Sequence, residues 1–308
     1  MLSDLSRATG DPPGEADALT ELGRARGIAG DLAGAVDAFS RALEIYRATG
    51  DRHGEADMLA DLGIVRRVSG DLAGTVDAFS RALEIYRATG DRHGEADALT
   101  ELGRARALTG DLADADNALG PALEFYRATG HHHGEAYVLT NLGTVRRLTG
   151  DLTGAGDALG QALEIYRTIG YGQGEAEALA NLGIIRRLTG DPAGARDAQA
   201  TALEIYRKIG SRHDEAWALN HYAATIAACG DLPRALALYR QALSMNGELN
   251  KPDGQALALE GIGECHLTAG ETKPGAARLR QALEIFQRLG MAPDAERVRT
   301  RLADLTTA

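Results

Sequence analysis

The sequence predicts an all-α solenoid, in which pairs of helices stack one after another. Residues 37–57 read DAFSRALEIYRATGDRHGEAD, and residues 77–97 repeat them letter for letter. The stretch GEADALTELGRAR at 14–26 also recurs at 94–106, so a period of 40 residues runs along the chain. Only 5% of the residues are aromatic, which leaves alanine and leucine to fill closely packed helices. Repeats of fixed length that contact only their neighbours form one extended domain.

Each repeat contains two helical stretches. In the first repeat the earlier helix is expected over about 15–29, and Gly30 ends it because glycine tolerates the left-handed conformation. Asp31 then caps a second helix that runs to Gly50. The inward positions of that second helix are Leu32, Ala35, Val36, Phe39, Ala42, Leu43 and Tyr46. The same Gly-Asp pair recurs at 70–71, 90–91, 110–111, 150–151, 190–191 and 230–231, and we interpret these aspartates as helix caps and not as catalytic or metal-binding residues.

The apolar and small residues of these helices resemble the tetratricopeptide repeat. Leu22-Gly23 is followed by Ala35, Phe39 and Ala42 in that family's order and spacing, and Leu62-Gly63 and Leu182-Gly183 begin similar series. A period of 40 is longer than the usual 34, as in the long-repeat subclass of kinesin light chains, spindle-orientation adaptors and bacterial signalling proteins. The resemblance implies a right-handed superhelix whose first helices line a concave groove.

We therefore predict seven antiparallel helix pairs and a C-terminal capping helix. The repeats are placed at 11–50, 51–90, 91–130, 131–170, 171–210, 211–250 and 251–290, and the capping helix within 291–308. Residues 1–10 resemble the end of a second helix without its first helix. This favours a C-terminal array taken from a longer parent protein, and the alternative is a short helix that caps the N-terminal end.

Some residues depart from the family pattern. Arginine stands where the family often places an aromatic residue, and we expect each guanidinium to bond a carboxylate or carbonyl of a neighbouring helix while its stem is packed. These arginines are Arg26, Arg66, Arg106, Arg146 and Arg186. Pro121 lies inside a second helix, where it costs about 3 kcal/mol unless the helix bends. Gly154, Gly156 and Gly160 weaken the next second helix, so the middle of the array is expected to be softer than its ends.

Composition restricts the possible functions. The formal net charge of −11 argues against nucleic acid or an anionic membrane as the partner. Two cysteines are too few for a disulfide framework, which favours a reducing compartment. No apolar run approaches the ~18 residues of a membrane span, and LSDLSRATGD after Met1 does not resemble a secretory signal. We therefore expect a cytoplasmic location.

We find no pattern typical of an enzyme, and we predict no catalytic residue, metal site or cofactor. The histidines at 53, 93, 133 and 213 recur at one turn position, which favours a structural role. The run His131-His132-His133 has no accompanying cysteine or acidic cluster, so metal binding is the weaker interpretation. Cys229 and Cys265 lie in neighbouring first helices, where both are expected to be core thiols.

The remaining candidate is the face of the first helices opposite Leu19 and Leu22, which we call the groove face. Four columns of residues, one residue per repeat, define it. The first column is Asp17, Asp57, Asp97, Tyr137, Glu177, Trp217 and Leu257. The second column is Glu21, Asp61, Glu101, Asn141, Asn181, His221 and Gly261. The third column is Arg24, Ile64, Arg104, Thr144, Ile184, Ala224 and Glu264. The fourth column is Ile28, Val68, Leu108, Leu148, Leu188, Ala228 and Thr268.

The groove face changes character along the chain. Early repeats offer charge pairs within one helix, Glu21 with Arg24 and Glu101 with Arg104, that satisfy each other. In repeats four to six the acids give way to amides and apolar groups, and in the long-repeat relatives an asparagine just before the Leu-Gly pair contacts bound peptide. The alternative is that Leu148 and Leu188 only pack against the next repeat. The predicted binding residues are Tyr137, Asn141, Thr144, Arg147, Leu148, Asn181, Ile184, Arg187, Leu188, Trp217, Asn220 and His221.

Two functions follow from this surface. The first is a non-catalytic adaptor that holds a peptide or protein segment with apolar and acidic residues, because amides bond backbone groups and arginine bonds carboxylates. The alternative is a C-terminal regulatory or sensor domain of a longer signalling ATPase or transcription regulator. A P-loop or DNA-binding domain encoded upstream would favour the second.

Overall fold

The computed structural model describes residues 12–307. These residues form 15 helices, α2 to α16, and contain no strand, which confirms the all-α prediction. The number of helices is consistent with seven pairs and a cap. The predicted partial helix at 1–10 lies outside the described residues. The chain divides into two compact units, an N-terminal unit that ends at Thr149 and a C-terminal unit that begins at Gly150.

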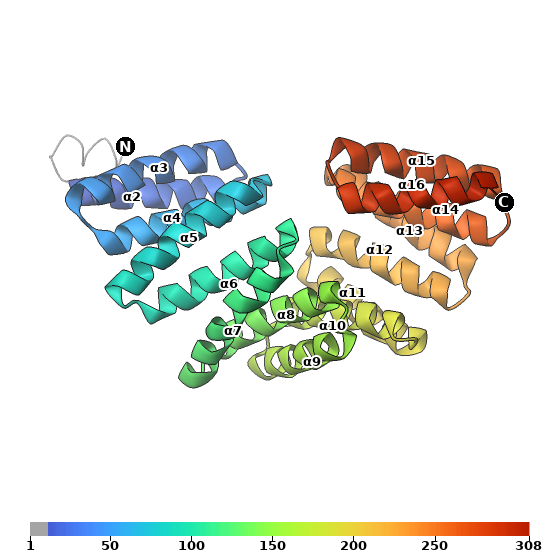
Figure 1. Ribbon diagram of the computed structural model, residues 1–308, viewed down its shortest axis with the longest axis horizontal. Coiled ribbons are helices and arrows are strands. Elements are labelled where there is room, and N and C mark those ends of the chain that lie inside the picture. Colours follow the sequence, from blue (N-terminus) through green and yellow to red (C-terminus); the bar gives the residue numbers. More distant parts are fainter. Residues whose placement is uncertain (1–11, 308) are drawn as a thin grey trace. The chain divides into compact units, whose positions relative to one another are not determined.

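In the N-terminal unit, each helix packs against the next one in the chain (Figure 1). Short turns between helices make successive helices antiparallel. The helices of this unit are α2 (Pro12–Ile28), α3 (Leu32–Thr49), α4 (Arg52–Ser69), α5 (Leu72–Thr89), α6 (Arg92–Thr109), α7 (Leu112–Thr129) and α8 (His132–Thr149).

The C-terminal unit is built in the same way. Its first helices also touch across repeats, α10 with α12 and α12 with α14, and α16 packs against α15 as the predicted cap. The helices of this unit are α9 (Leu152–Ile169), α10 (Gly172–Leu188), α11 (Pro192–Ile209), α12 (Arg212–Ala228), α13 (Leu232–Glu248), α14 (Pro252–Thr268), α15 (Thr272–Arg288) and α16 (Ala292–Thr307). Within the described part of the chain, no helix is both long and apolar enough for a membrane span.

Aspartate side chains cap seven of the 15 described helices, among them most of those preceded by the predicted Gly-Asp pairs. The carboxylate of each accepts a hydrogen bond from the backbone N–H three residues later, as Asp71 does from Gly74 at 2.9 Å. The aspartates that do so are Asp31, Asp51, Asp71, Asp91, Asp151, Asp191 and Asp231. A Cβ at Gly74 would lie 2.1 Å from Asp71 Oδ2, so glycine lets the cap close tightly.

Asp111 does not cap its helix through its side chain, so the capping prediction is wrong there. Asp114 occupies the position of the usual glycine, and its side chain adds bulk and negative charge beside the cap. The Asp111 carboxylate instead accepts a hydrogen bond from Thr109 Oγ1 at 3.0 Å.

His131 takes over the capping role at the start of α8. It stands where the two preceding repeats begin with Asp51 and Asp91, and its Nδ1 accepts from the Gly134 N–H at 3.1 Å. An imidazole nitrogen can therefore do here what a carboxylate oxygen does elsewhere. The first histidine of the conspicuous run thus has a structural task.

Four of the five arginines expected to pack their stems also form the predicted bond to a neighbouring helix. Arg26 Nη1 donates to the Gly34 carbonyl of the following helix at 3.0 Å, and Arg66 repeats this with Gly74 at 3.1 Å. Arg106 and Arg186 donate to the equivalent carbonyls at 3.4 and 3.2 Å. Each bond ties the end of a first helix to the start of its second helix.

Within each unit, the core lies between the paired helices and depends on small residues at the contact. A Cβ at Gly23 would lie 2.5 Å from the Phe39 ring, and one at Gly63 would lie 2.6 Å from Phe79. The aromatic ring therefore needs glycine opposite it. In later repeats the position of Phe39 holds Leu119, Leu159, Gln199, Tyr239 and Leu279.

Candidate binding surface on the first helices

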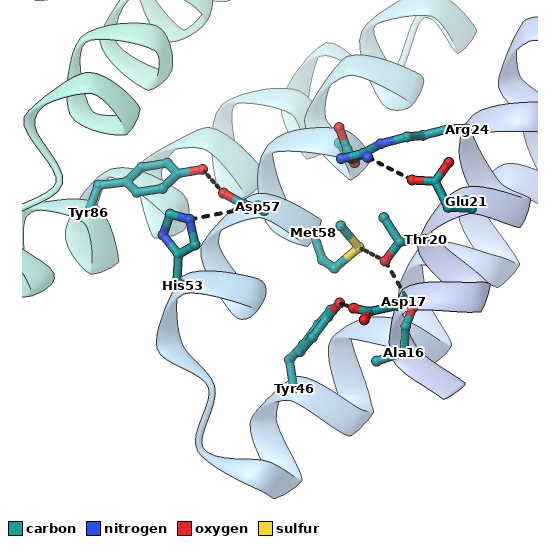
Figure 2. Close-up of polar contacts among 11 residues, drawn as sticks. Ala16, Asp17, Thr20, Glu21, Arg24, Tyr46, His53, Asp57, Met58 and Tyr86 are labelled. Atoms are coloured by element: carbon teal, nitrogen blue, oxygen red, sulfur yellow. Dashed lines mark hydrogen bonds and ion pairs between the residues drawn. The ribbon is translucent and has the colours of Figure 1, made fainter. Parts of the chain in front are cut away.

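In the N-terminal unit, the acids of the first column are bonded within their own repeats. Tyr46 Oη donates to Asp17 at 2.8 Å, and Tyr86 Oη donates to Asp57 at the same distance (Figure 2). The pKa of both tyrosines is raised, mainly by burial, with the neighbouring carboxylate as a further cause. These acids therefore hold the second helix against the first and are poorly suited to bind a partner.

The second and third columns of this unit also pair with each other. Arg24 Nη1 bonds Glu21 at 3.0 Å (Figure 2), which confirms the pair predicted within α2. Arg24 Nη2 also reaches Asp61 of α4 at 3.2 Å. Burial raises the pKa of the Asp61 carboxyl more than Arg24 lowers it. The ion pairs thus run between successive first helices as well as along one helix.

Tyr137 joins this network at the second predicted pair, Glu101 and Arg104. Its hydroxyl donates to Glu101 Oε1 at 2.8 Å and accepts from Arg104 Nη1 at 2.7 Å, so it lies between the two charges. Arg67 Nε lies 3.3 Å from Glu101 Oε2. Burial raises the pKa of Tyr137, and Glu101 raises it further. Tyr137 is therefore a bonded, half-buried residue and not a bare aromatic surface.

The other predicted residues of α8 lie along the groove face. Asn141 Nδ2 donates to the Tyr137 carbonyl at 2.9 Å, and Thr144 Oγ1 donates to the Thr140 carbonyl at 3.3 Å. Arg147 is half-buried, whereas Leu148 is 47% exposed. Leu148 thus presents apolar surface to solvent.

The fourth column carries exposed apolar side chains in the first helices of both units. Leu188 in α10 is 48% exposed and Leu148 in α8 is 47% exposed. The further exposed members of the column are Ile28, Val68 and Leu108.

In the C-terminal unit, the predicted residues differ in accessibility. Asn181 is 8% exposed and its Nδ2 donates to the Glu177 carbonyl at 3.0 Å. Ile184 is buried, so its side chain belongs to the core. Arg187 is half-buried, and its Nε is a buried atom without a hydrogen-bond partner among residues 12–307. Arg187 therefore offers a donor that the described structure does not use.

The predicted residues of α12 also differ in accessibility. The rings of Trp217 and His221 lie 4.4 Å apart and both side chains are half-buried. Asn220 is buried and donates to the Gly254 carbonyl of α14 at 3.0 Å. Asn220 thus joins two first helices inside the stack, and a partner would meet Trp217 and His221 instead.

A hollow of about 280 Å³ lies between α12, α13 and α14. The sequence analysis did not predict this hollow, although several groove-face positions carry smaller side chains in α12 and α14 than in the earlier first helices. The lining includes Ala224 and Ala227 from α12, Tyr239 from α13, and Gly261, Glu264 and Cys265 from α14. Equivalent positions in earlier repeats carry larger residues such as Ile184, Arg187 and Asn181.

The two cysteines differ in their surroundings. Cys265 is buried, and burial raises the pKa of its thiol, as expected for a core residue. Cys229 is exposed at the end of α12, so its assignment to the core is wrong. The helix ends one residue before Cys229, so this cysteine lies outside the buried turns of the helix. Across residues 12–307, no three or more His, Cys, Asp or Glu side chains gather as a metal site would need.

Comparison with solved structures gives relatives of the same fold. RapI, in its apo form, has a TM-score of 0.75 with 14% identity, covering 90% of this chain and 99% of its own. The Rap conjugation gene regulator of plasmid pLS20, in complex with the Phr* peptide, has a TM-score of 0.72 with 16% identity, covering 96% and 79%.

A signal transduction ATPase with a tetratricopeptide repeat sensor, from Pyrococcus horikoshii, has a TM-score of 0.64 with 15% identity. The alignment covers 87% of this chain and 41% of that one. At these identities the likeness establishes the fold alone. None of the curated protein sequences matches the chain.

The sequence profile of the tetratricopeptide repeat matches residues 54–128, 134–208 and 214–288, and a second profile of the same repeat matches 2–51. These ranges cover most of the chain and agree with the helix pairs described above. The chain belongs to the tetratricopeptide repeat family.

Proposed function

We propose that this protein is a non-catalytic scaffold that binds a peptide or protein segment along the groove face of its first helices. Family membership supports a role in protein interaction, and the related Rap regulator is described as a complex with a peptide. A solenoid presents an extended surface on which such a segment can lie.

The observation that carries this proposal is the difference between early and later repeats. In α2, α4 and α6 the acids and arginines of the groove face bond one another or a tyrosine. In α10 and α12 the groove face instead carries the Trp217–His221 pair and Arg187, whose Nε has no hydrogen-bond partner among residues 12–307, while the exposed Leu188 is a feature shared with the early repeats. Half-exposed apolar groups beside an unused cationic donor are typical of contact sites.

The partner that fits is a segment with apolar side chains and one or two carboxylates. Leu148 and Leu188 offer apolar contacts in their respective units, and Asn141 and Asn181 offer amide groups. An arginine beside a carboxylate forms a charge-assisted bond, which weakens as salt rises unless it is shielded from water.

The test is a binding titration with a peptide selected on the intact protein from a random display library. We expect Asn181→Ala and Arg187→Ala to weaken binding by about one to two decades, because each removes a hydrogen-bonding group worth roughly 1–3 kcal/mol. Glu21→Ala and Arg24→Ala serve as controls, since those residues bond each other. If the control pair weakens binding and the first pair does not, the site lies in the early repeats.

A regulatory or sensor domain of a larger signalling protein is the second candidate. The similarity to the sensor-bearing ATPase favours it, because this chain matches only part of that protein. The test is to read the coding sequence upstream of this chain and, where a P-loop domain is found, to measure ATP hydrolysis with and without the array. Activity that rises when the array is removed would support an inhibitory role, and unchanged activity would contradict it.

A further inference from the structure

The hollow between α12, α13 and α14 results from three linked substitutions. Ala223 replaces the glycine that receives an aromatic ring in repeats one and two, where Phe39 approaches the Cβ position of Gly23 to 2.5 Å. The methyl group of Ala223 fills that space, and the Tyr239 ring lies against Gly261 of the next repeat. A Cβ at Gly261 would lie 2.1 Å from Cζ of that ring. Tyr239 therefore reaches the groove-face position that holds an acid or amide in five of the other repeats.

The Tyr239 hydroxyl is left without a partner. The residue is 6% exposed and lines the hollow, yet its hydroxyl makes no hydrogen bond with any residue in the range 12–307. The tyrosines of the early repeats behave differently, since Tyr46 and Tyr86 donate to aspartates. The Tyr239 hydroxyl thus faces the hollow with its hydrogen-bonding capacity unused by the described residues, and it is available to a ligand group.

Arg187 does not line the hollow, but it lies on α10, the helix packed against α12, and carries a cationic donor. It stands on α10 at the position that Ala227 occupies on α12, and these two helices are in contact. Its charge reaches the phenol: the pKa of Tyr239 is raised by burial and by Cys265, and Arg187 acts in the opposite direction. Arg187 Nε, like the hydroxyl, is unused among the described residues.

The acid in the hollow is already neutralised. Glu264 accepts bidentate hydrogen bonds from Arg301 of α16, at 3.0 Å from Nε and 3.2 Å from Nη2. The group in the lining that remains unused is therefore the Tyr239 hydroxyl, a donor, and Arg187 on the neighbouring α10 supplies the positive charge. A larger hollow of about 360 Å³ near Arg212 and Glu248 is less suitable, because those two side chains bond each other at 2.7 Å.

We propose that this hollow is a pocket for one acidic side chain of the bound segment, whose carboxylate accepts hydrogen bonds from Tyr239 Oη and Arg187. The methylene groups of that side chain lie against Ala224, Ala227 and Gly261. The inference rests on the proposed function and moves the main specificity site to repeats five to seven. It adds Tyr239, Ala224 and Gly261 to the residues that recognise the partner.

The test uses a dodecapeptide selected on the intact protein, and its analogue in which the single conserved Glu is replaced by Gln. Fluorescence anisotropy at low salt is expected to show about tenfold tighter binding of the Glu peptide. Arg187→Gln should remove the preference for Glu. Tyr239→Phe, which deletes only the hydroxyl, should weaken the Glu peptide by about three- to tenfold.

Two further variants distinguish weaker binding caused by a blocked hollow from weaker binding caused by loss of the fold. Ala224→Ile introduces the residue that repeat five carries at this column and should block the hollow and weaken both peptides. Tyr222→Phe is the matched control, because its hydroxyl bonds Arg234 at 3.1 Å and Tyr222 does not line the hollow. Circular dichroism checks that each variant retains its helices.

The outcomes distinguish this inference from the proposed function. If Tyr239→Phe and Ala224→Ile bind the Glu peptide like the parent while Asn181→Ala weakens it, the pocket is overturned and the scaffold function stands. A selected peptide without an acidic residue would also overturn the pocket. If the parent selects no peptide at all, both proposals are overturned.

Discussion

At the residue scale, Gln199 departs most clearly from the pattern of its column. It occupies the position in α11 that holds Phe39 in α3 and Leu159 in α9. Its side chain is 1% exposed, and within the described range neither amide atom has a hydrogen-bond partner. A buried amide without partners loses its hydrogen bonds to water and forms none within the protein, which lowers the stability of the fold.

We therefore expect Gln199→Leu to raise the free energy of unfolding by about 1–3 kcal/mol, because it removes the unbonded amide and keeps an apolar side chain in contact with Gly183. Urea denaturation followed by circular dichroism measures the change. The reverse substitution in the same unit, Leu159→Gln, should lower the midpoint. A lower midpoint for Gln199→Leu would mean that the amide has a stabilising partner.

The aspartate caps provide a second comparison at this scale. Asp71→Ala should lower the free energy of unfolding by about 0.5–2 kcal/mol, because the Gly74 N–H loses its acceptor. Asp111→Ala should cost less, since Asp111 makes no side-chain cap. Thermal melting of the two variants checks the difference, and equal losses would contradict the role assigned to the cap.

At the scale of elements, ion pairs link five of the second helices, α3, α5, α7, α9 and α11, to the first helix of the next repeat. Arg47 Nε bonds Glu55 at 2.9 Å, and the same pair recurs as Arg87 with Glu95 at 2.9 Å and Arg207 with Glu215 at 2.7 Å. The glutamates of these pairs are largely buried, at 10–13% side-chain exposure, while the arginines are partly exposed.

The helix α7 contains Pro121 in its interior and still runs from Leu112 to Thr129.

We expect Pro121→Ala to raise the melting midpoint, because proline provides no N–H for the helical hydrogen bond and the helix continues on both sides of it. The change is at most about 3 kcal/mol. Differential scanning calorimetry of the intact protein measures it. A lower midpoint would show that a local bend at Pro121 contributes to the packing of its neighbours.

At the scale of the whole molecule, each helix packs mainly on helices adjacent in the chain or one further along. Stability is then close to a sum of repeat terms and neighbour terms, and damage stays local. The C-terminal end illustrates this, because Val298 of α16 is buried with Phe286 and Leu279 in a separate core cluster.

Val298→Asp places a charge in that cluster and should unfold the end of the C-terminal unit first. Hydrogen exchange is expected to accelerate in α14, α15 and α16 and to stay unchanged in α4 and α5. Wild-type-like exchange in α4 and α5 is the internal control. Uniform acceleration along the chain would show that the protein unfolds as one cooperative body.

The sequence by itself determined the repeat, the helix boundaries, most caps and the packed arginine stems. These features depend on residues close together in the chain, so local rules of capping and helical spacing predict them. Only the tertiary structure decided which groove-face residues remain available: Asp17 is bonded to Tyr46, and Tyr137 lies between Glu101 and Arg104. Helical spacing shows which side chains share a face, whereas stacking decides which of them meet across helices. The displacement of Tyr239 against Gly261 arises from that stacking, and with it the hollow that we propose as a binding pocket.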